Sequence, residues 1–193
     1  MIKSSLRQEL LKRRSMLSLE QVRDSSEHVT LHLENWLHLQ SAYTVMAYWP
    51  MRNEISLLGL ITNNQDKAWV LPRILPNRQL ALLRFDPDKL ERHPWGMYEP
   101  LESCDAVQRE SINMVLVPGV GFSKDGSRIG YGGGYYDRLL KGMAAVRVGI
   151  THSQMLVDRI PAESHDCLMD YVATQEGIIS TSNRVHPGKN NSR

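Results

Sequence analysis

The stretch Arg128-Ile-Gly-Tyr-Gly-Gly-Gly-Tyr-Tyr-Asp137 is the most informative part of this chain of 193 residues. It contains four of the chain's 13 glycines within five positions: Gly130, Gly132, Gly133 and Gly134. Each glycine in an ordered segment costs roughly 0.5–1 kcal/mol of backbone entropy relative to alanine, so this group requires left-handed dihedrals or a close approach of the backbone to another group. Bare N–H groups between a cation and a carboxylate suit an anionic ligand, and we interpret the stretch as a phosphate-binding loop.

The segments around this loop alternate between strand-like and helix-like patterns. Short β-branched and aromatic runs predict strands at residues 43–49, 68–71, 80–85, 114–117, 146–150 and 171–173. Helix-compatible segments lie between several of them, at residues 55–61, 106–110 and 135–143. This alternation predicts an α/β fold, with three layers (α/β/α) and a mostly parallel central sheet. The glycine stretch follows the strand at 114–117, and ligands of such sheets bind at the carboxyl ends of strands.

The first 40 residues have a helical pattern, with Leu6, Leu10 and Leu17 at four- and seven-residue spacing. Ser18 and Gln21 form a candidate capping box. We expect residues 1–180 to form a single domain and the polar residues 181–193 to form a disordered tail.

Composition excludes several classes of protein. A hydrophobic content of 41% and a charged content of 23% are typical of globular domains, and a net charge of +2 is too small to favour nucleic-acid binding. No apolar run of 18 residues and no signal-peptide pattern occur, so we expect a cytoplasmic protein without membrane contact. Cys104 and Cys167 lack metal-ligand spacing and are expected to be free thiols. We expect a monomer.

Other polar residues allow two interpretations from the sequence alone. Lys3 and Arg7 are spaced i,i+4, with Arg14 a further seven residues along, and they form either a solvated helix face or a second phosphate contact. Asp137 is either a helix cap or a ligand of a divalent cation, for which Asp170 is the second acidic candidate. Glu54 is either an acid at a helix N-terminus or a carboxylate directed at a ligand. The loop itself matches neither the Walker A nor the dinucleotide-binding motif.

Taken together, several stretches resemble the 5-formyltetrahydrofolate cyclo-ligase family, also called methenyltetrahydrofolate synthetases. The resemblance covers roughly residues 1 to 180 in the family's order. The stretches that carry it are Lys3-Ser-Ser-Leu-Arg7, Tyr48 with Asn53-Glu-Ile55, Tyr98-Glu-Pro100, Val117-Pro-Gly-Val-Gly-Phe122, Arg128 to Arg138, and Asp158-Arg-Ile-Pro-Ala-Glu-Ser-His-Asp166.

The resemblance implies an enzyme that uses ATP and Mg²⁺ to convert 5-formyltetrahydrofolate to 5,10-methenyltetrahydrofolate, releasing ADP and phosphate. In this chemistry the γ-phosphoryl group activates the formyl oxygen, and N10 then closes the ring. Two alternatives remain: an ATP-dependent activator of another small formyl or carboxamide compound, and a catalytically silent regulator that binds nucleotide or folate. The presence of Glu54, Arg128 and Asp137 weighs against the silent regulator.

The resemblance also implies roles for individual residues. Arg128, Tyr135 and Asp137 are implied to be catalytic, and Asp137 and Asp170 to hold the metal. The implied substrate-binding residues are Trp49, Glu54, Tyr131, Gly132, Gly133, Gly134 and Tyr135, with Glu54 accepting hydrogen bonds from the pterin. The implied ATP-binding residues are Lys3, Ser4, Ser5, Leu6, Arg7, Arg128, Ile129, Gly130, Tyr131, Gly132, Gly133, Gly134, Tyr135 and Tyr136.

The chain departs from the family pattern in the loop itself. Other members can carry basic residues at the positions held here by Tyr131 and Gly133. We therefore expect phosphate charge to be neutralised from elsewhere in this chain. The candidates are Arg128, Lys124, Arg138 and Arg73.

Overall fold

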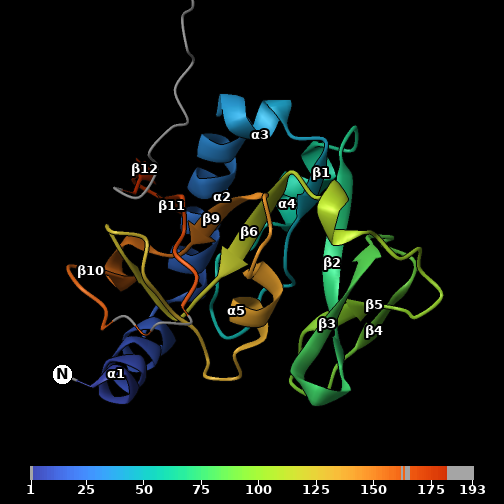
Figure 1. The fold of residues 1–193 in the computed structure, drawn as a ribbon. Coiled ribbons are helices and arrows are strands. Elements are labelled where there is room, and N and C mark those ends of the chain that lie inside the picture. The colour runs from blue at the N-terminus through green and yellow to red at the C-terminus, as the bar shows by residue number, and fades with distance from the viewer. Residues whose placement is uncertain (1, 162, 164–165, 182–193) are drawn as a thin grey trace, which may run out of the picture.

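A seven-stranded sheet forms the centre of the protein in a computed structural model that describes residues 2–161, 163 and 166–181 (Figure 1). The strand order is β12-β11-β9-β6-β1-β2-β3. The five inner strands are parallel, and the edge strands β12 and β3 are antiparallel to their neighbours. The strands are β1 (Thr44–Met46), β2 (Ala68–Leu75), β3 (Gln79–Arg84), β6 (Met114–Pro118), β9 (Val146–Ile150), β11 (Tyr171–Thr174) and β12 (Gly177–Ser180). The predicted mostly parallel sheet is confirmed.

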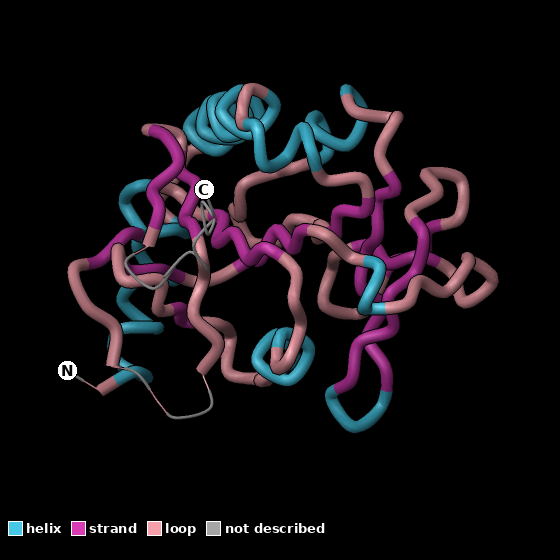
Figure 2. The backbone as a smooth tube through the Cα atoms, turned by 45° about the horizontal axis from the view of Figure 1, so that its top comes forward, coloured by secondary structure: helices cyan, strands magenta, loops and turns pink. Residues whose placement is uncertain are grey.

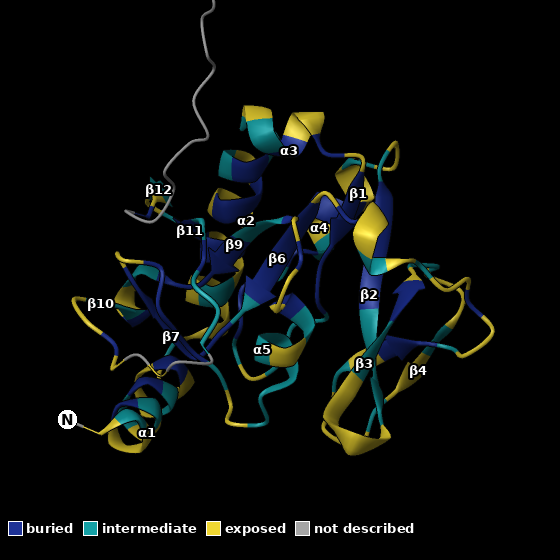
Figure 3. Ribbon diagram, in the orientation of Figure 1, coloured by how far each residue is buried: buried dark blue, intermediate teal, exposed yellow. Residues whose placement is uncertain are grey.

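Helices cover both faces of this sheet (Figure 2). Residues alternate between the two faces along a strand, so Val45 and Ala47 pack into one apolar cluster and Met46 into the other. The first cluster lies under α2 (Leu19–Glu34), α3 (Leu37–Ser41) and α4 (Leu58–Asn63), and the second includes α5 (Tyr135–Leu140). The inner strands are mostly buried apart from the second half of β2 and the start of β9 (Figure 3), as expected for a parallel sheet with helices on both sides.

A smaller unit holds the first helix, α1 (Lys3–Ser15). It consists of a three-stranded sheet in the order β10-β7-β8, built from β7 (Gly121–Ser123), β8 (Arg128–Ile129) and β10 (Leu156–Val157). Leu6 and Leu10 of α1 pack there against Val120, Ile129 and Met155. The connector after β6 is therefore a hairpin, and its second strand leads directly into the glycine loop, residues 130–134.

The β2–β3 hairpin extends beyond the edge of β1 and carries the two-stranded sheet of β4 (Leu90–Arg92) and β5 (Tyr98–Pro100) (Figure 1). The predicted strand at 68–71 continues through Pro72 to Leu75. Proline is tolerated because β1 pairs with β2 only as far as Val70, so beyond that point β2 has a neighbour, β3, on one side only.

Three predicted helices differ from the structure. The segment 106–110 is not an α-helix: Ala106 forms a bridge with Leu83, Val107 N donates to Leu82 O, and a 3₁₀ turn (Arg109–Ser111) begins only afterwards. Edge pairing with β3 thus replaces helical hydrogen bonds. The helix predicted at 55–61 is α4, which begins at Leu58, and the helix predicted at 135–143 is α5, which ends at Leu140.

The local predictions for the start of the chain are confirmed. Helices α1, α2 and α3 cover most of residues 3–41, and the Ser18–Gln21 capping box makes both of its hydrogen bonds. Cys104 and Cys167 are free. Among the described residues, no helix has the length and apolar character needed to cross a membrane. The predicted tail at 181–193 lies outside the described residues except for Thr181, which is buried.

Leu10 tests how α1 is attached. Its side chain is fully buried against the small sheet, so Leu10→Ala is expected to lower the free energy of unfolding by about 2–5 kcal/mol. Urea unfolding measures this, with Leu19→Ala as the control, because Leu19 on α2 is 84% exposed. Equal effects of the two substitutions would show that α1 is not packed as described.

Candidate active site

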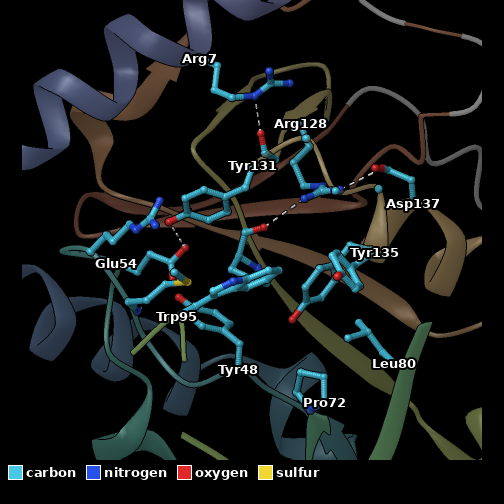
Figure 4. Close-up of a pocket in the computed structure, with 18 of the residues that line it drawn as sticks. Arg7, Tyr48, Glu54, Pro72, Leu80, Trp95, Arg128, Tyr131, Tyr135 and Asp137 are labelled. Carbon is cyan, nitrogen blue, oxygen red and sulfur yellow. Dashed lines mark hydrogen bonds and ion pairs between the residues drawn. The ribbon is translucent and has the colours of Figure 1, made fainter. Parts of the chain in front are cut away.

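A cavity of about 1010 Å³ lies where the carboxyl ends of β1 and β6 approach the glycine loop (Figure 4). Its walls come from α1, the turn after β1, the β2–β3 hairpin, the β4–β5 turn, the glycine loop and the segment before β11. Most of these segments are distant in sequence. The cavity is at the upper end of the size range of small-molecule sites, ~300–1,000 Å³.

The glycine loop adopts conformations that require glycine at two positions. Gly132 has φ 97°, and Gly134, with φ 68°, is the left-handed residue that precedes α5. These left-handed dihedrals are unfavourable for residues with a Cβ atom. The side chain of Arg7 on α1 holds the loop in place, because its Nε donates to Gly130 O at 2.8 Å. Arg7 therefore contacts the backbone of this loop, and its predicted contact with phosphate stays a prediction.

Arg128 and Asp137 form an ion pair across the loop. Arg128 Nη2 donates to Asp137 Oδ1 at 2.9 Å, and Arg128 Nη1 donates to Pro118 O at 3.3 Å. The Arg128 side chain is nearly buried, whereas 22% of the Asp137 side chain is exposed. The Asp137 carboxylate therefore faces the cavity while its partner is fixed below it.

Lys3 reaches the cavity from the start of α1. Its Nζ lies 2.6 Å from Asp166 Oδ2 and 3.3 Å from Glu163 Oε2. All three residues line the cavity. The structure therefore places a cation at the cavity together with the two acidic residues that it contacts.

Glu54 ends a strained turn at the opposite end of the cavity. Arg52 and Asn53 have left-handed φ values of 49° and 58°, which cost energy and are typical of functional sites. The turn closes through two hydrogen bonds between Met51 and Glu54: Glu54 N donates to Met51 O, and Met51 N donates to Glu54 Oε2, both at 3.0 Å. Glu54 lines the cavity although it is only 6% exposed.

A buried arginine and a tyrosine hold the other oxygen of this carboxylate. The Tyr131 hydroxyl donates to Glu54 Oε1 at 2.9 Å and accepts a hydrogen bond from Arg14 Nη2. Arg14 Nη1 lies 3.7 Å from the same carboxylate oxygen and donates to Gly119 O at 2.9 Å. Burial raises the pKa of Glu54 above its ordinary value, and Arg14, the Met51 N–H and Tyr131 act in the opposite direction.

The remaining wall is aromatic and apolar. The Trp49 and Tyr98 rings have centroids 5.0 Å apart, and Trp95 meets Tyr135 edge to face at 6.2 Å. Pro72, Ile74, Leu80 and Met97 complete this wall. Figure 4 shows Arg7, Arg128 and Asp137 on one side of the cavity, with Pro72 and Leu80 on the other.

Most residues predicted from the sequence meet at this one cavity. It is lined by Lys3, Ser4, Arg7, Trp49, Glu54, Arg128, Gly130, Tyr131, Gly132, Gly133, Gly134, Tyr135, Tyr136 and Asp137. Ser5, Leu6 and Ile129 do not line it. Leu6 of α1 and Ile129 of β8 belong to the apolar cluster between α1 and the small sheet, so their side chains are buried away from the cavity.

Asp170 does not line the cavity either. It precedes β11, and its Oδ2 accepts a hydrogen bond from Arg147 N at 2.8 Å and lies 3.6 Å from Arg147 Nε. Both residues are at the amino-terminal ends of parallel strands, whereas ligands collect at the carboxyl ends. Besides Asp137, the aspartate that lines the cavity is Asp166, four residues before Asp170.

The four basic residues expected to neutralise phosphate charge in place of loop cations do not all reach the cavity. Of the four candidates, Arg128 alone lines the large cavity. Arg138 contacts the outer side of the glycine loop, donating to Gly133 O at 2.7 Å, and Arg73 pairs with Glu91. Lys124 is exposed and lines no part of the cavity.

Sequence reasoning gave no site role to Asp166 or to the apolar wall from the β2–β5 region, and it named Arg14 only as a further member of the basic face of Lys3 and Arg7. Asp166 ends the stretch Asp158–Asp166 that resembles the family, so the sequence offered it as a candidate site residue. Arg14 follows Arg7 by seven residues on the same helix face, but periodicity gives no sign that its guanidinium is buried. Residues such as Pro72 and Leu80 carry no motif, so their position depends on the hairpin that folds over the site.

Fold and cavity together define a family of ligases. Residues 1–175 match the "5-formyltetrahydrofolate cyclo-ligase family", and the chain belongs to it. Two relatives named 5-formyltetrahydrofolate cyclo-ligase are similar over most of their length. The one from Haemophilus influenzae is 30% identical, covering 85% of this chain and 92% of the relative. The one from Mycolicibacterium smegmatis is 31% identical, covering 92% and 96%.

A solved structure has the same fold. The NMR structure of Aquifex aeolicus 5,10-methenyltetrahydrofolate synthetase matches with a TM-score of 0.86 and 31% identity, covering 100% of both chains. The family predicted from the sequence motifs is therefore confirmed.

The raised pKa of Glu54 predicts a pH dependence of stability. The folded protein binds this proton more tightly than the unfolded chain, so the free energy of unfolding falls as pH rises above the ordinary value of 4.5. Glu54→Gln removes this titration, and the variant is expected to gain stability relative to the wild type as pH rises. Urea unfolding between pH 4 and 8 measures the difference, with exposed Glu20→Gln as the control. Parallel curves for wild type and Glu54→Gln would contradict the assignment.

Proposed function

We propose that this protein converts 5-formyltetrahydrofolate to 5,10-methenyltetrahydrofolate with hydrolysis of ATP to ADP and phosphate. The observation that carries the proposal is the two-sided cavity. One side combines the backbone of the glycine loop with Lys3, Arg7 and Arg128, and the other is apolar and aromatic and ends at the buried carboxylate of Glu54. Its volume suits a nucleotide and a folate bound side by side.

The cationic side suits the triphosphate. The N–H groups of residues 130–134 and the side chains of Lys3 and Arg7 offer hydrogen bonds and positive charge to phosphate oxygens. Tyr135 and Tyr136 follow the loop and line the same region. Phosphoryl transfer asks the protein mainly for positioning and charge stabilisation, which these groups supply.

The apolar side suits the folate. Trp49 and Tyr98 present aromatic surface for a planar pterin, and the Glu54 carboxylate accepts hydrogen bonds from its N–H donors. Leu80 and Pro72 extend this surface along the hairpin. The formyl group then lies between the pterin and the glycine loop.

Asp137 and Asp166 are the carboxylates that fit a magnesium ion. Mg²⁺ usually takes one or two carboxylates together with phosphate oxygens and water. Both aspartates line the cavity beside the loop, and within the described ranges no cluster of three or more acidic, histidine or cysteine side chains offers a complete metal cage. When bound, the ion neutralises charge on the phosphate oxygens.

The chemistry follows from the poor leaving ability of a formamide oxygen. The formyl oxygen attacks the γ-phosphorus and ADP leaves, which gives a phosphorylated imidate. N10 then attacks the formyl carbon, N10 loses its proton, and the C–O bond breaks to release inorganic phosphate. Arg128 is fixed by hydrogen bonds to Asp137 and to Pro118 O, and it offers positive charge to the phosphoryl group beside the glycine loop.

The near-ultraviolet absorbance of the methenyl product tests the proposal. Purified protein with 5-formyltetrahydrofolate, ATP and Mg²⁺ is expected to produce this band, and omission of ATP is expected to abolish it. ADP and phosphate should appear in equal amounts with the product. Intact nucleotide binding without any ATP-dependent product would instead favour the silent regulator.

The two aspartates predict a specific change in magnesium dependence. Asp137→Ala is expected to lower kcat by roughly 10²-fold, comparable to the loss of one preorganised charge-stabilising group. Asp166→Asn is expected to raise the Mg²⁺ concentration needed for half-maximal rate. Asp170→Asn is the control, expected to leave that concentration unchanged because Asp170 does not line the cavity. If Asp170→Asn changed that concentration and Asp166→Asn did not, the metal would be assigned to Asp170 and not to Asp166.

A further inference from the structure

We propose that Arg14, which does not itself line the cavity, positions the Glu54 carboxylate for the substrate and does so together with the Tyr131 hydroxyl. This inference rests on the proposed function and extends it. Arg14 would be a positioning residue, since its contacts run to protein groups only. Arg14 would thus contribute to folate binding from the first helix, although it lies outside the sequence stretches that resemble the family.

Arg14, Tyr131 and Glu54 form a chain of hydrogen bonds in which every donor points toward Glu54. Arg14 donates to the Tyr131 hydroxyl, and that hydroxyl donates to Glu54 Oε1 at 2.9 Å. The Tyr131 oxygen is thereby used as acceptor and donor at once, which fixes the orientation of its proton. The ring of Tyr131 lines the cavity, so this chain links a residue of the glycine loop to the carboxylate at the other end of the site.

The backbone of Arg14 holds the same turn. Asn53 Nδ2 donates to Arg14 O at 3.3 Å and to Leu17 O at 3.2 Å, and Asn53 O lies 2.9 Å from His152 Nε2. These contacts hold Asn53 in its left-handed conformation. The carboxylate of Glu54 is therefore positioned through both the side chain and the main chain of the end of α1.

The burial of two opposite charges, on Arg14 and Glu54, favours a role for Arg14 beyond packing. Arg14 is 2% exposed and Glu54 is 6% exposed, and buried ion pairs are weak contributors to stability because both charges lose water. The groups that face Glu54 are Arg14 from α1, Arg52 from the turn, Tyr131 from the loop, and the more distant phenols of Tyr48 and Tyr136.

Burial raises the pKa of Glu54, and Arg14 is the strongest of the groups that lower it. Without Arg14, the pKa of Glu54 would be higher, and its carboxyl group would stay protonated up to a higher pH. A protonated carboxyl offers fewer acceptor sites to two neighbouring pterin N–H groups.

The test measures folate affinity and ATP affinity separately between pH 6 and 9. Arg14→Met is expected to raise the dissociation constant of 5-formyltetrahydrofolate by roughly 10–100-fold at pH 7, since loss of a charge partner shifts a carboxyl pKa by roughly 1–3 units. The ATP affinity is expected to change by less than about threefold, within the context dependence of single interactions. The pH below which folate affinity falls is expected to move upward by about one unit or more. Tyr131→Phe should act in the same direction.

Arg13→Met is the matched control. Arg13 is adjacent on α1 but exposed, and it pairs with Glu9 on the surface, so its replacement should leave folate affinity and its pH profile unchanged. A purely structural role of Arg14 would lower stability without moving the pH profile. Wild-type folate affinity and pH profile in both Arg14→Met and Tyr131→Phe would overturn the inference.

A double variant separates positioning from folding. If Arg14 acts through Glu54, then Arg14→Met combined with Glu54→Gln should bind folate no more weakly than Glu54→Gln alone, and additive losses would contradict the inference. If Arg14→Met does not fold, Arg14→Lys and Tyr131→Phe decide the question by the same pH profile. Failure of the proposed function is distinguishable, because it is seen as absence of ATP-dependent product in the wild type.

Discussion

The buried guanidinium of Arg14 connects four parts of the protein that are far apart in the sequence. It belongs to α1, it donates to the carbonyl of Gly119 just after β6, and it contacts both Tyr131 of the glycine loop and Glu54 of the turn after β1. Removing one member of such a buried pair typically costs roughly 3–5 kcal/mol, because the other charge is left without a partner. These contacts therefore fix the end of α1, the glycine loop and the turn after β1 relative to one another at the end of the cavity that holds Glu54.

The rest of the site is arranged around that constraint. Residues with a Cβ atom adopt left-handed φ values in two turns, at Arg52 and Asn53 after β1 and at Asn77 and Arg78 between β2 and β3, and the glycine loop has such values at Gly132 and Gly134. Rigid strands that carry irregular loops are a common way to position reactive groups. Phosphate-binding groups lie on one side of the cavity and apolar surface on the other, so two chemically different ligands meet over the loop.

Asp166 and Asp170 show where motif-based reasoning reaches its limit. Both are acidic, both belong to the same segment before β11, and they are four residues apart. In the folded chain Asp166 meets Lys3 at the cavity, whereas Asp170 is bonded to Arg147 at the start of β9. The direction in which the segment runs across the end of the sheet separates them, and residue type does not.

The sequence by itself determined the features that depend on near neighbours: the strand runs, the capping box of α2, the glycine loop and the family to which the chain belongs. Periodicity, dihedral preferences and motif spacing act over a few residues, so they are visible in one dimension. Tertiary structure alone decided which side chains face one another. Arg14 and Tyr131 are 117 positions apart and Lys3 and Asp166 are 163 positions apart, and such contacts exist only after the chain has packed. Burial, charge pairing and the shape of the cavity are therefore properties of the packed fold.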